Sequence, residues 1–81
     1  MNYKVLDKIT VPKSLLEDRR LSNGAKFLFI LLCFEQGKKI EVRHLVKIID
    51  RSPQTIRLWL RRLAQTGWVT PKDKRYECHM Q

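Results

Sequence analysis

Cationic and amide side chains recur between residues 51 and 66 at the spacing of one helix face. Arg57 and Arg61 lie four residues apart and so project from the same side of a helix, with Gln54 and Leu58 on a neighbouring strip nearer its start. Arginine can bind guanine and glutamine can bind adenine through paired hydrogen bonds, whereas leucine can only touch a thymine methyl group. This pattern predicts contact with base edges in a DNA groove, and its alternative is a solvated helix face.

A second set of residues can contact phosphates, which position a protein on DNA without reading its sequence. This set consists of Thr55 and the cations Arg43, Arg51, Arg62, Lys72, Lys74 and Arg75. For Thr55 the alternative role is support of the turn before the helix, and for the cations it is a solvated charged surface. Together with the base-contacting residues, the full set of DNA-binding candidates is Arg43, Arg51, Gln54, Thr55, Arg57, Leu58, Arg61, Arg62, Lys72, Lys74 and Arg75.

The helix that presents these residues has clear boundary signals. Ser52 can accept hydrogen bonds from the free amides of the first turn, and Pro53 occupies a position where a missing N–H has no cost. Gly67 supplies a left-handed stop, so the sequence predicts a helix over 53–66. Its apolar stripe, which should pack inward, is Ile56, Leu60 and Leu63.

The sequence also predicts the helices and strands that come before and after this helix in the chain. Residues 43–49 predict a shorter helix, and the three residues 50–52 then form a turn, which gives a helix-turn-helix. A short strand is expected over 38–42. After Gly67, two strands over 68–70 and 75–80 should form a hairpin whose basic tip is 71–74.

A helix is predicted over 23–36, from the N-cap Ser22 to the stop at Gly37. It is apolar nearly all round, so it must be covered on more than one side. The cover is either the N-terminal segment or the same helix of a second copy, which would give a homodimer through Phe27–Phe34. Residues 1–21 should be an N-terminal arm, with an extended segment over 3–12 and one or two helical turns over 13–20.

Composition limits the classes of protein that remain. With 81 residues, the chain should be a single domain over 1–81, with its core in 22–81. A net charge of +9 favours nucleic acid or an anionic surface, with a merely solubilising charge as the alternative. The apolar run 27–34 is too short to span a membrane. The sequence shows no secretory signal, so we expect a cytoplasmic protein in which Cys33 and Cys78 stay reduced. We expect no cofactor, metal or enzymatic activity.

The motifs resemble those of winged helix-turn-helix proteins. Ser52, Thr55-Ile56, Leu60, Leu63, Gly67 and Val69 match a pattern common in winged-helix regulators, and Val11-Pro12, Leu15, Asp18, Leu21-Ser22, Ala25-Lys26, Leu28 and Leu31-Leu32 are similar to the start of winged-helix domains in plasmid and phage replication proteins. The resemblance implies an α+β fold with three main helices and a small antiparallel C-terminal hairpin, the wing.

The implied function is sequence-selective binding of double-stranded DNA through a recognition helix over 53–66 and a basic wing over 70–76. Because the chain ends after the wing, we expect an accessory or regulatory protein of a plasmid, phage or other mobile element, acting in replication, transcription regulation or conjugation. Leu58-Trp59 stands where many such regulators have an arginine, so Lys72, Lys74 and Arg75 should carry more of the binding. The alternative is a winged-helix adaptor that binds a protein partner within a larger nucleoprotein assembly.

Overall fold

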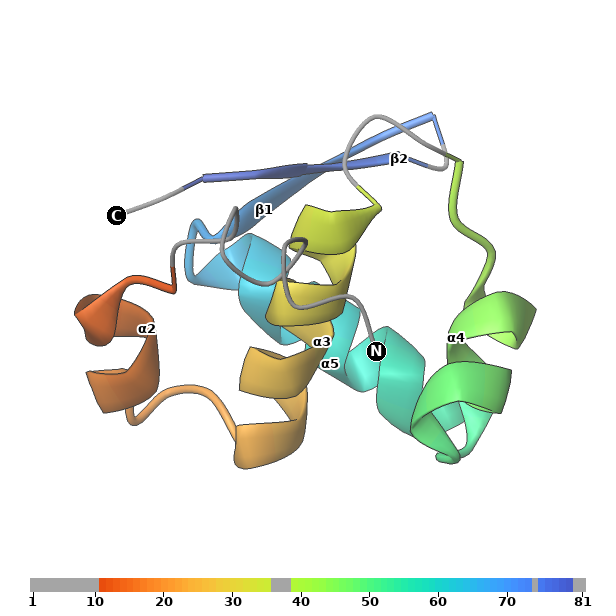
Figure 1. The fold of residues 1–81 in the computed structure, drawn as a ribbon, viewed down its shortest axis with the longest axis horizontal. Helices are drawn as coiled ribbons and strands as arrows, with labels where there is room; N and C mark the ends of the chain where they lie inside the picture. The colour runs from red at the N-terminus through yellow and green to blue at the C-terminus, as the bar shows by residue number, and fades with distance from the viewer. Residues whose placement is uncertain (1–10, 36–38, 74, 80–81) are drawn as a thin grey trace.

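The computed structural model describes residues 11–35, 39–73 and 75–79. Four helices precede a C-terminal hairpin in the described part of the chain: α2 (Lys13–Glu17), α3 (Asn23–Phe34), α4 (Val42–Ile49), α5 (Pro53–Gln65), β1 (Val69–Lys72) and β2 (Arg75–Cys78). The hairpin lies across one end of α3 and α5, with α2 and α4 on opposite sides (Figure 1). The α+β class predicted from the sequence is confirmed. The arm predicted over 3–12 lies almost wholly outside the described residues.

Local signals set the ends of α5 as expected. The Ser52 hydroxyl accepts a hydrogen bond from the Thr55 amide at 3.2 Å, and Pro53 is the first helical residue. At the other end, Gly67 takes a positive φ of 82°, a conformation that glycine adopts without steric cost. This turn lets the Trp68 amide bond back to the Leu63 carbonyl at 2.9 Å. The predicted helix over 53–66 is therefore confirmed, with its last residue at Gln65.

The connection between α4 and α5 is the predicted three-residue turn. Asp50 ends α4 in the left-handed conformation, with φ 60° and ψ 50°, at the point where such turns often use glycine. Aspartate tolerates this conformation better than most residues because its short polar side chain can bond locally. The two helices thus follow each other closely, with only residues 51 and 52 between Asp50 and Pro53.

The strand predicted over 38–42 is not formed in its described part. Residues 39–41 are an irregular connection, and Val42 already belongs to α4. In the ranges that the structure describes, the sheet consists of β1 and β2. Ile40 is nevertheless buried, at 8% exposure. The alternation that predicted a strand therefore reflects one apolar side chain inserted into the core from a connecting segment.

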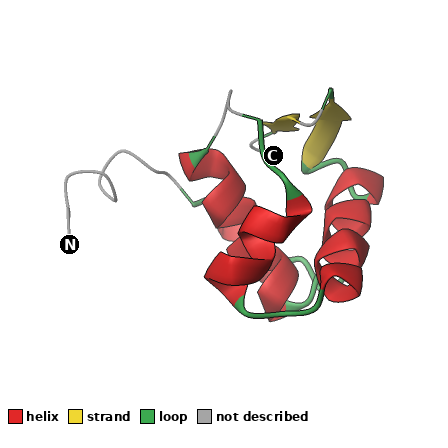
Figure 2. Ribbon diagram, turned by 90° about the vertical axis from the view of Figure 1, so that its right-hand side faces the viewer, coloured by secondary structure: helices red, strands yellow, loops and turns green. Residues whose placement is uncertain are grey.

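One apolar cluster unites all the elements. Its buried members are Leu15, Leu21, Ala25, Leu28, Phe29, Leu32, Ile40, Leu45, Ile56, Leu60, Leu63, Trp68 and Val69. Leu15 and Leu21 come from the N-terminal segment, so this segment provides part of the cover for α3. The far side of α3 is less protected: Phe27 is 50% exposed, and Leu31 and Phe34 are half-buried. Figure 2 shows the helices grouped beneath the hairpin.

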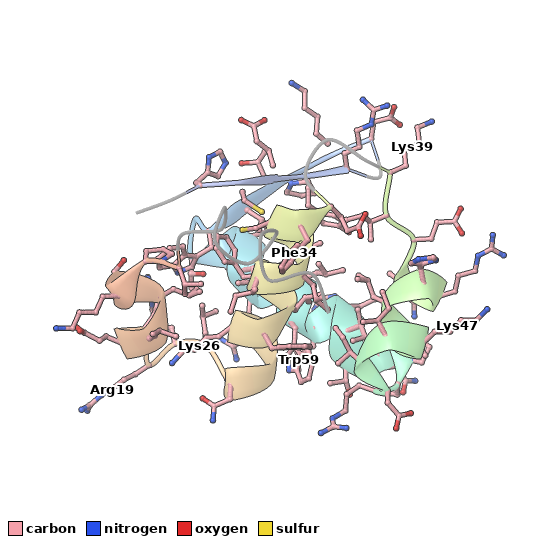
Figure 3. The ribbon with its side chains drawn as sticks, viewed as in Figure 1. Arg19, Lys26, Phe34, Lys39, Lys47 and Trp59 are labelled. Carbon is pink, nitrogen blue, oxygen red and sulfur yellow. The ribbon has the colours of Figure 1, made fainter. Side chains whose placement is uncertain are left out.

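The close approach of α3 and α5 depends on Gly24. The six-membered part of the Trp59 indole lies against its Cα, so that a Cβ at position 24 would overlap ring atoms Cη2, Cζ2 and Cζ3. Trp59 itself is half-buried at the edge of the core (Figure 3). The absence of a side chain at position 24 thus makes room for the largest side chain of α5.

This contact predicts a reversal of the usual effect of Gly→Ala. Inside a helix, alanine is normally more stable than glycine by about 0.5–1 kcal/mol. Here Gly24→Ala should lower the free energy of unfolding by about 1–2 kcal/mol, because overpacking outweighs that gain. In a Trp59→Leu background the same change should stabilise by about 0.5–1 kcal/mol. Urea unfolding of the four proteins measures both effects, and a stabilising Gly24→Ala in the wild-type background would contradict the packing argument.

Candidate nucleic-acid interface

The outward face of α5 carries most of the candidate residues. Ile56, Leu60 and Leu63 are buried on its inner face, as the apolar stripe predicted. On the outer face the exposed residues are Gln54, Arg57, Leu58, Arg61, Arg62 and Gln65. Leu58 is 48% exposed. One helix therefore presents three arginines, two carboxamides and an apolar side chain to the surroundings, and it contains no acidic residue.

Arg57 and Arg43 lie beside the same surface hollow. This hollow is bordered by Ile40, Glu41, Val42, Arg43, Arg57 and Tyr76, and so lies where α4, α5 and β2 meet. The Arg43 guanidinium forms an ion pair of 2.5 Å with the Glu41 carboxylate. Both side chains are largely exposed, so water and salt screen this pair. Arg43 is thus partly neutralised, whereas no ion pair of Arg57 occurs within the described ranges.

Two candidates at the helix-turn-helix junction have local partners. The Thr55 hydroxyl lies 3.0 Å from the Ser52 hydroxyl, and the side chain is half-buried, which favours its alternative role as support for the turn. The Arg51 guanidinium donates to the Asp50 carbonyl at 3.1 Å but remains exposed. Arg51 therefore stays accessible at the start of α5.

The first strand of the hairpin extends to Lys72, beyond its predicted end at residue 70, whereas the second, Arg75–Cys78, is shorter than the predicted 75–80. The register pairs Val69 with Cys78 and Lys72 with Arg75, so residues 71 and 72 of the expected tip belong to β1. Pro71 lies within β1, which is compatible with an edge strand that does not need its N–H. Asp73 takes a positive φ of 50° in the turn. Lys74, one of the predicted contact residues, lies outside the described residues.

The residue pair nearest the turn of the hairpin, which we call its last rung, brings two positive charges together. Lys72 and Arg75 are directly opposite each other, so their side chains leave the same face of the sheet, and both are exposed. Like charges in such a pair destabilise a sheet. In the part of the chain that the structure describes, neither cation forms an ion pair with a carboxylate. An anion bound at this rung would remove the repulsion.

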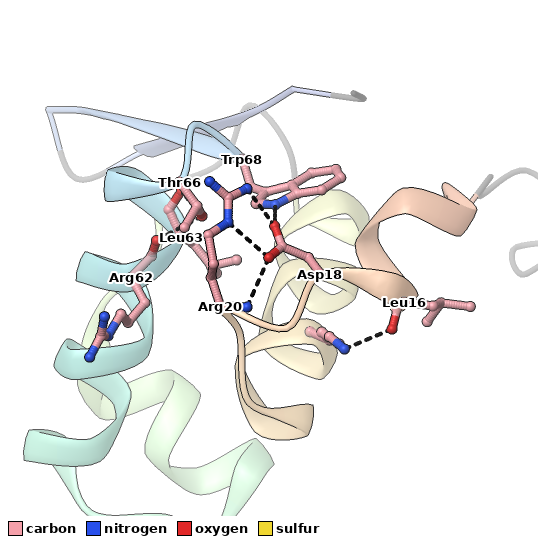
Figure 4. A network of polar contacts seen from close by, with 8 residues as sticks. Leu16, Asp18, Arg20, Arg62, Leu63, Thr66 and Trp68 are labelled. Atoms are coloured by element: carbon pink, nitrogen blue, oxygen red, sulfur yellow. Dashed lines mark hydrogen bonds and ion pairs between the residues drawn. The ribbon is translucent and has the colours of Figure 1, made fainter.

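A buried polar contact joins the start of the chain to the hairpin (Figure 4). The Trp68 indole N–H donates to Asp18 Oδ2 at 2.9 Å across 50 residues of sequence. Arg20 donates from Nη2 to the same oxygen at 2.7 Å, and from Nε and its amide to Oδ1 at 2.9 Å. Only 7% of the Asp18 side chain is exposed. Arg20 and the Trp68 indole therefore hold the pKa of Asp18 well below its usual value of 3.8.

The two cysteines, predicted as separate packing residues, contact each other. Both are free thiols at the edge of the core, with Cys33 on α3 and Cys78 on β2. The hydrogen bond between them lowers the pKa of Cys33, and it raises the pKa of Cys78, as burial also does. Within the described ranges, no three His, Cys, Asp or Glu residues are placed to hold a metal ion.

Comparison of this chain with models of known protein families, with curated proteins and with solved structures finds no match. Among the described residues, no helix is long and apolar enough to cross a bilayer.

The Asp18 contact predicts a specific pH dependence of stability. Because the pKa of Asp18 is lowered on folding, its stabilising effect is complete above the unfolded value of 3.8 and is lost as the pH falls towards the folded value. At pH 7, Asp18→Asn should therefore be clearly less stable than the wild type, and the gap should narrow below about pH 4. Urea unfolding between pH 7 and pH 2.5 measures the gap.

Glu17→Gln is the matched control, since Glu17 forms only an exposed ion pair of 3.6 Å with Lys13. It should change stability little at any pH. A gap between wild type and Asp18→Asn that stays constant down to pH 2.5 would show that the charge of Asp18 is not what stabilises the fold.

Proposed function

We propose that this protein is a winged helix-turn-helix protein that binds double-stranded DNA and catalyses no reaction. In this proposal α5 is the recognition helix, the β1–β2 hairpin is the wing, and α3 with α4 completes the three-helix unit. The order of these elements supports the assignment: a long helix, a helix-turn-helix and a hairpin follow one another along the chain.

The observation that carries this proposal is that the cations of α5 and of the hairpin form no ion pairs within the described ranges. The ion pairs within the described ranges involve Lys13, Arg20 and Arg43, all outside α5 and the hairpin. The cations of α5 and of the last hairpin rung, by contrast, are exposed and have no ion pair there: Arg57, Arg61, Arg62, Lys72 and Arg75. Other described cations without an ion pair are Arg19, Lys26, Lys39, Lys47 and Arg51. Five unpaired positive charges on two successive elements, one of which contains no acidic residue, suit the phosphates of a duplex.

The neighbouring polar residues suit sequence readout. Gln54, Arg57 and Arg61 can make paired hydrogen bonds to adenine or guanine, and exposed Leu58 can contact a thymine methyl group. Arg62, Arg51 and the wing cations would bind phosphates. We infer that the biological setting is an accessory or regulatory role in a plasmid, phage or other mobile element, which is supported by the sequence resemblance described above.

Binding to duplexes selected from a randomised pool tests this function by fluorescence anisotropy across a salt series. Neutralisation of about five phosphates should give a slope of log affinity against log salt of about −4.5. Arg57→Ala/Arg61→Ala should remove discrimination between selected and unrelated duplexes, by about 1–3 kcal/mol for each lost base contact. Lys72→Ala/Arg75→Ala should weaken binding to all duplexes evenly.

Lys13→Ala is the control, because it removes an exposed cation of α2 that lies outside both DNA-contacting elements. It should leave affinity and salt slope unchanged. No binding of the wild-type protein to any duplex at low salt would overturn the proposed function.

The rung of like charges in the wing predicts opposite changes in stability and affinity. Lys72→Glu places a carboxylate opposite Arg75 and should raise the free energy of unfolding by about 0.2–1 kcal/mol. The same change should weaken DNA binding and make the salt slope shallower by about 1. Thermal unfolding and anisotropy measure the two effects, with the neutral Lys72→Gln as the intermediate case. A variant that gains stability without losing affinity would place the wing outside the interface.

A second function has its own supporting observation. Phe27 is 50% exposed on α3, next to the half-buried Ile30, Leu31 and Phe34. This apolar surface would suit a protein partner of an adaptor, or a homodimer through residues 27–34. Sedimentation analysis of Phe27→Ser against wild type separates this function from DNA binding, since only association through α3 should be lost.

A further inference from the structure

A second hollow lies beside α5, away from the one that contains Arg57. It measures about 450 Å³ and is lined by Arg19, Arg20, Ser22, Leu58, Trp59 and Arg62. Arg57 and Arg62 are five residues apart, so they project about 140° apart around the helix. The hollow is therefore a cleft on the other flank of α5, between this helix and the connection from α2 to α3. Arg62 and Leu58 were predicted from the sequence to contact DNA, whereas Arg19 was not.

The cleft holds positive charge that the protein does not neutralise. Of its three guanidinium groups, that of Arg20 is bound on two atoms by the Asp18 carboxylate. Arg19 and Arg62 are exposed and have no ion pair within the described ranges. Figure 3 shows Arg19 extending from the connection after α2. Two arginines without an ion pair thus border one hollow from two different elements.

Each side of the cleft is anchored by contacts elsewhere in the protein. On one wall, Arg19 lies between Asp18 and Arg20, which bind each other and are tied to Trp68. On the other wall, Arg62 belongs to α5, whose inner face is buried in the core. Contacts within the protein therefore fix the backbone on both sides of the cleft. Preorganised cations lose less entropy on binding than cations on a mobile loop.

The remaining lining residues favour a phosphate next to a DNA groove. The Ser22 hydroxyl accepts from the Ala25 amide at 3.2 Å, which leaves its own hydrogen free to donate. Leu58 and Trp59 supply low-dielectric walls, which strengthen the attraction of an anion. Leu58 also belongs to the outer face of α5 that is proposed to read bases. An anion in the cleft therefore lies directly beside that face.

We propose that this cleft binds one backbone phosphate of the DNA duplex, held between Arg19 and Arg62. The inference rests on the proposed DNA-binding function and adds a contact outside the helix-turn-helix and the wing. It extends the interface to the connection between α2 and α3. Arg19 is then a phosphate-contacting residue that would position α5 in the groove.

Neutralisation of single phosphates tests this contact. A selected duplex is prepared as a series in which one phosphate at a time is replaced by an uncharged methylphosphonate. At one position the replacement should weaken wild-type binding about tenfold, the size of one charge-assisted interaction. At that same position it should have no further effect on Arg19→Gln or on Arg62→Gln. Lys13→Gln, the control, should respond to every replacement as the wild type does.

The failure of this inference is distinguishable from failure of the proposed function. If wild type binds duplexes but Arg19→Gln shows the same affinity, salt slope and methylphosphonate profile, the cleft does not bind DNA and the proposed function stands. If wild type binds no duplex, both are overturned. Arg19 has an exposed side chain, so its variant should keep the thermal stability of the wild type. Chemical shifts of the Arg19 and Arg62 side chains that respond to inorganic phosphate but not to duplex would also overturn the DNA assignment.

Discussion

The hydrogen bond from the Trp68 indole to the Asp18 carboxylate joins parts of the chain that are 50 residues apart. Trp68 is 2% exposed and packs edge-to-face on Phe29, with ring centroids 5.5 Å apart. Its indole N–H could not be buried there without an acceptor, because an unpaired buried donor costs about 1–3 kcal/mol. Asp18 supplies the acceptor, and hydrogen bonds from Arg20 and from the indole itself lower the pKa of Asp18. A polar group in the core thereby becomes a means of aligning distant segments.

The backbone of Trp68 extends this alignment to the two elements of the candidate interface. Its amide bonds to the Leu63 carbonyl at the end of α5, and its carbonyl accepts from the His79 amide just after β2. Trp68 thus connects α5, both strands of the hairpin at its open end, and the segment before α3. The direction in which the hairpin leaves α5 follows from these bonds. The backbone segments that carry the cations of the two elements are consequently held in place relative to each other.

Features coded by neighbouring residues were predictable from the sequence. The start of α5 depends on Ser52 and Pro53, and its end on Gly67, so its boundaries were correct to one residue. The hairpin was predicted, but the start of its turn was not, because Asp73 rather than a glycine adopts the positive φ there. Ile40 misled the strand prediction since an isolated buried side chain and a strand give the same short pattern.

Contacts across long sequence separations had no local signal. Nothing around Asp18 or Trp68 indicates that they meet, and the contact between Cys33 and Cys78 joins two motifs that were interpreted separately. The same holds for the cleft: Arg19 is one of two adjacent arginines, and only the structure shows that Arg20 is neutralised and Arg19 is not. The free cations of an interface are thus defined by where the acidic residues lie in space. The cations of α5 were predictable from the sequence, but which arginines elsewhere form ion pairs was not.

The contact between Gly24 and Trp59 bears on how this fold can vary during evolution. Each residue sets a limit on the size of the other, so a larger residue at position 24 is tolerable only after the indole has been replaced by a shorter side chain. The two positions should therefore change together in descendants of this chain, with loss of the tryptophan coming first. Their joint state would then mark lineages that share this helix crossing, even where the surface arginines have diverged.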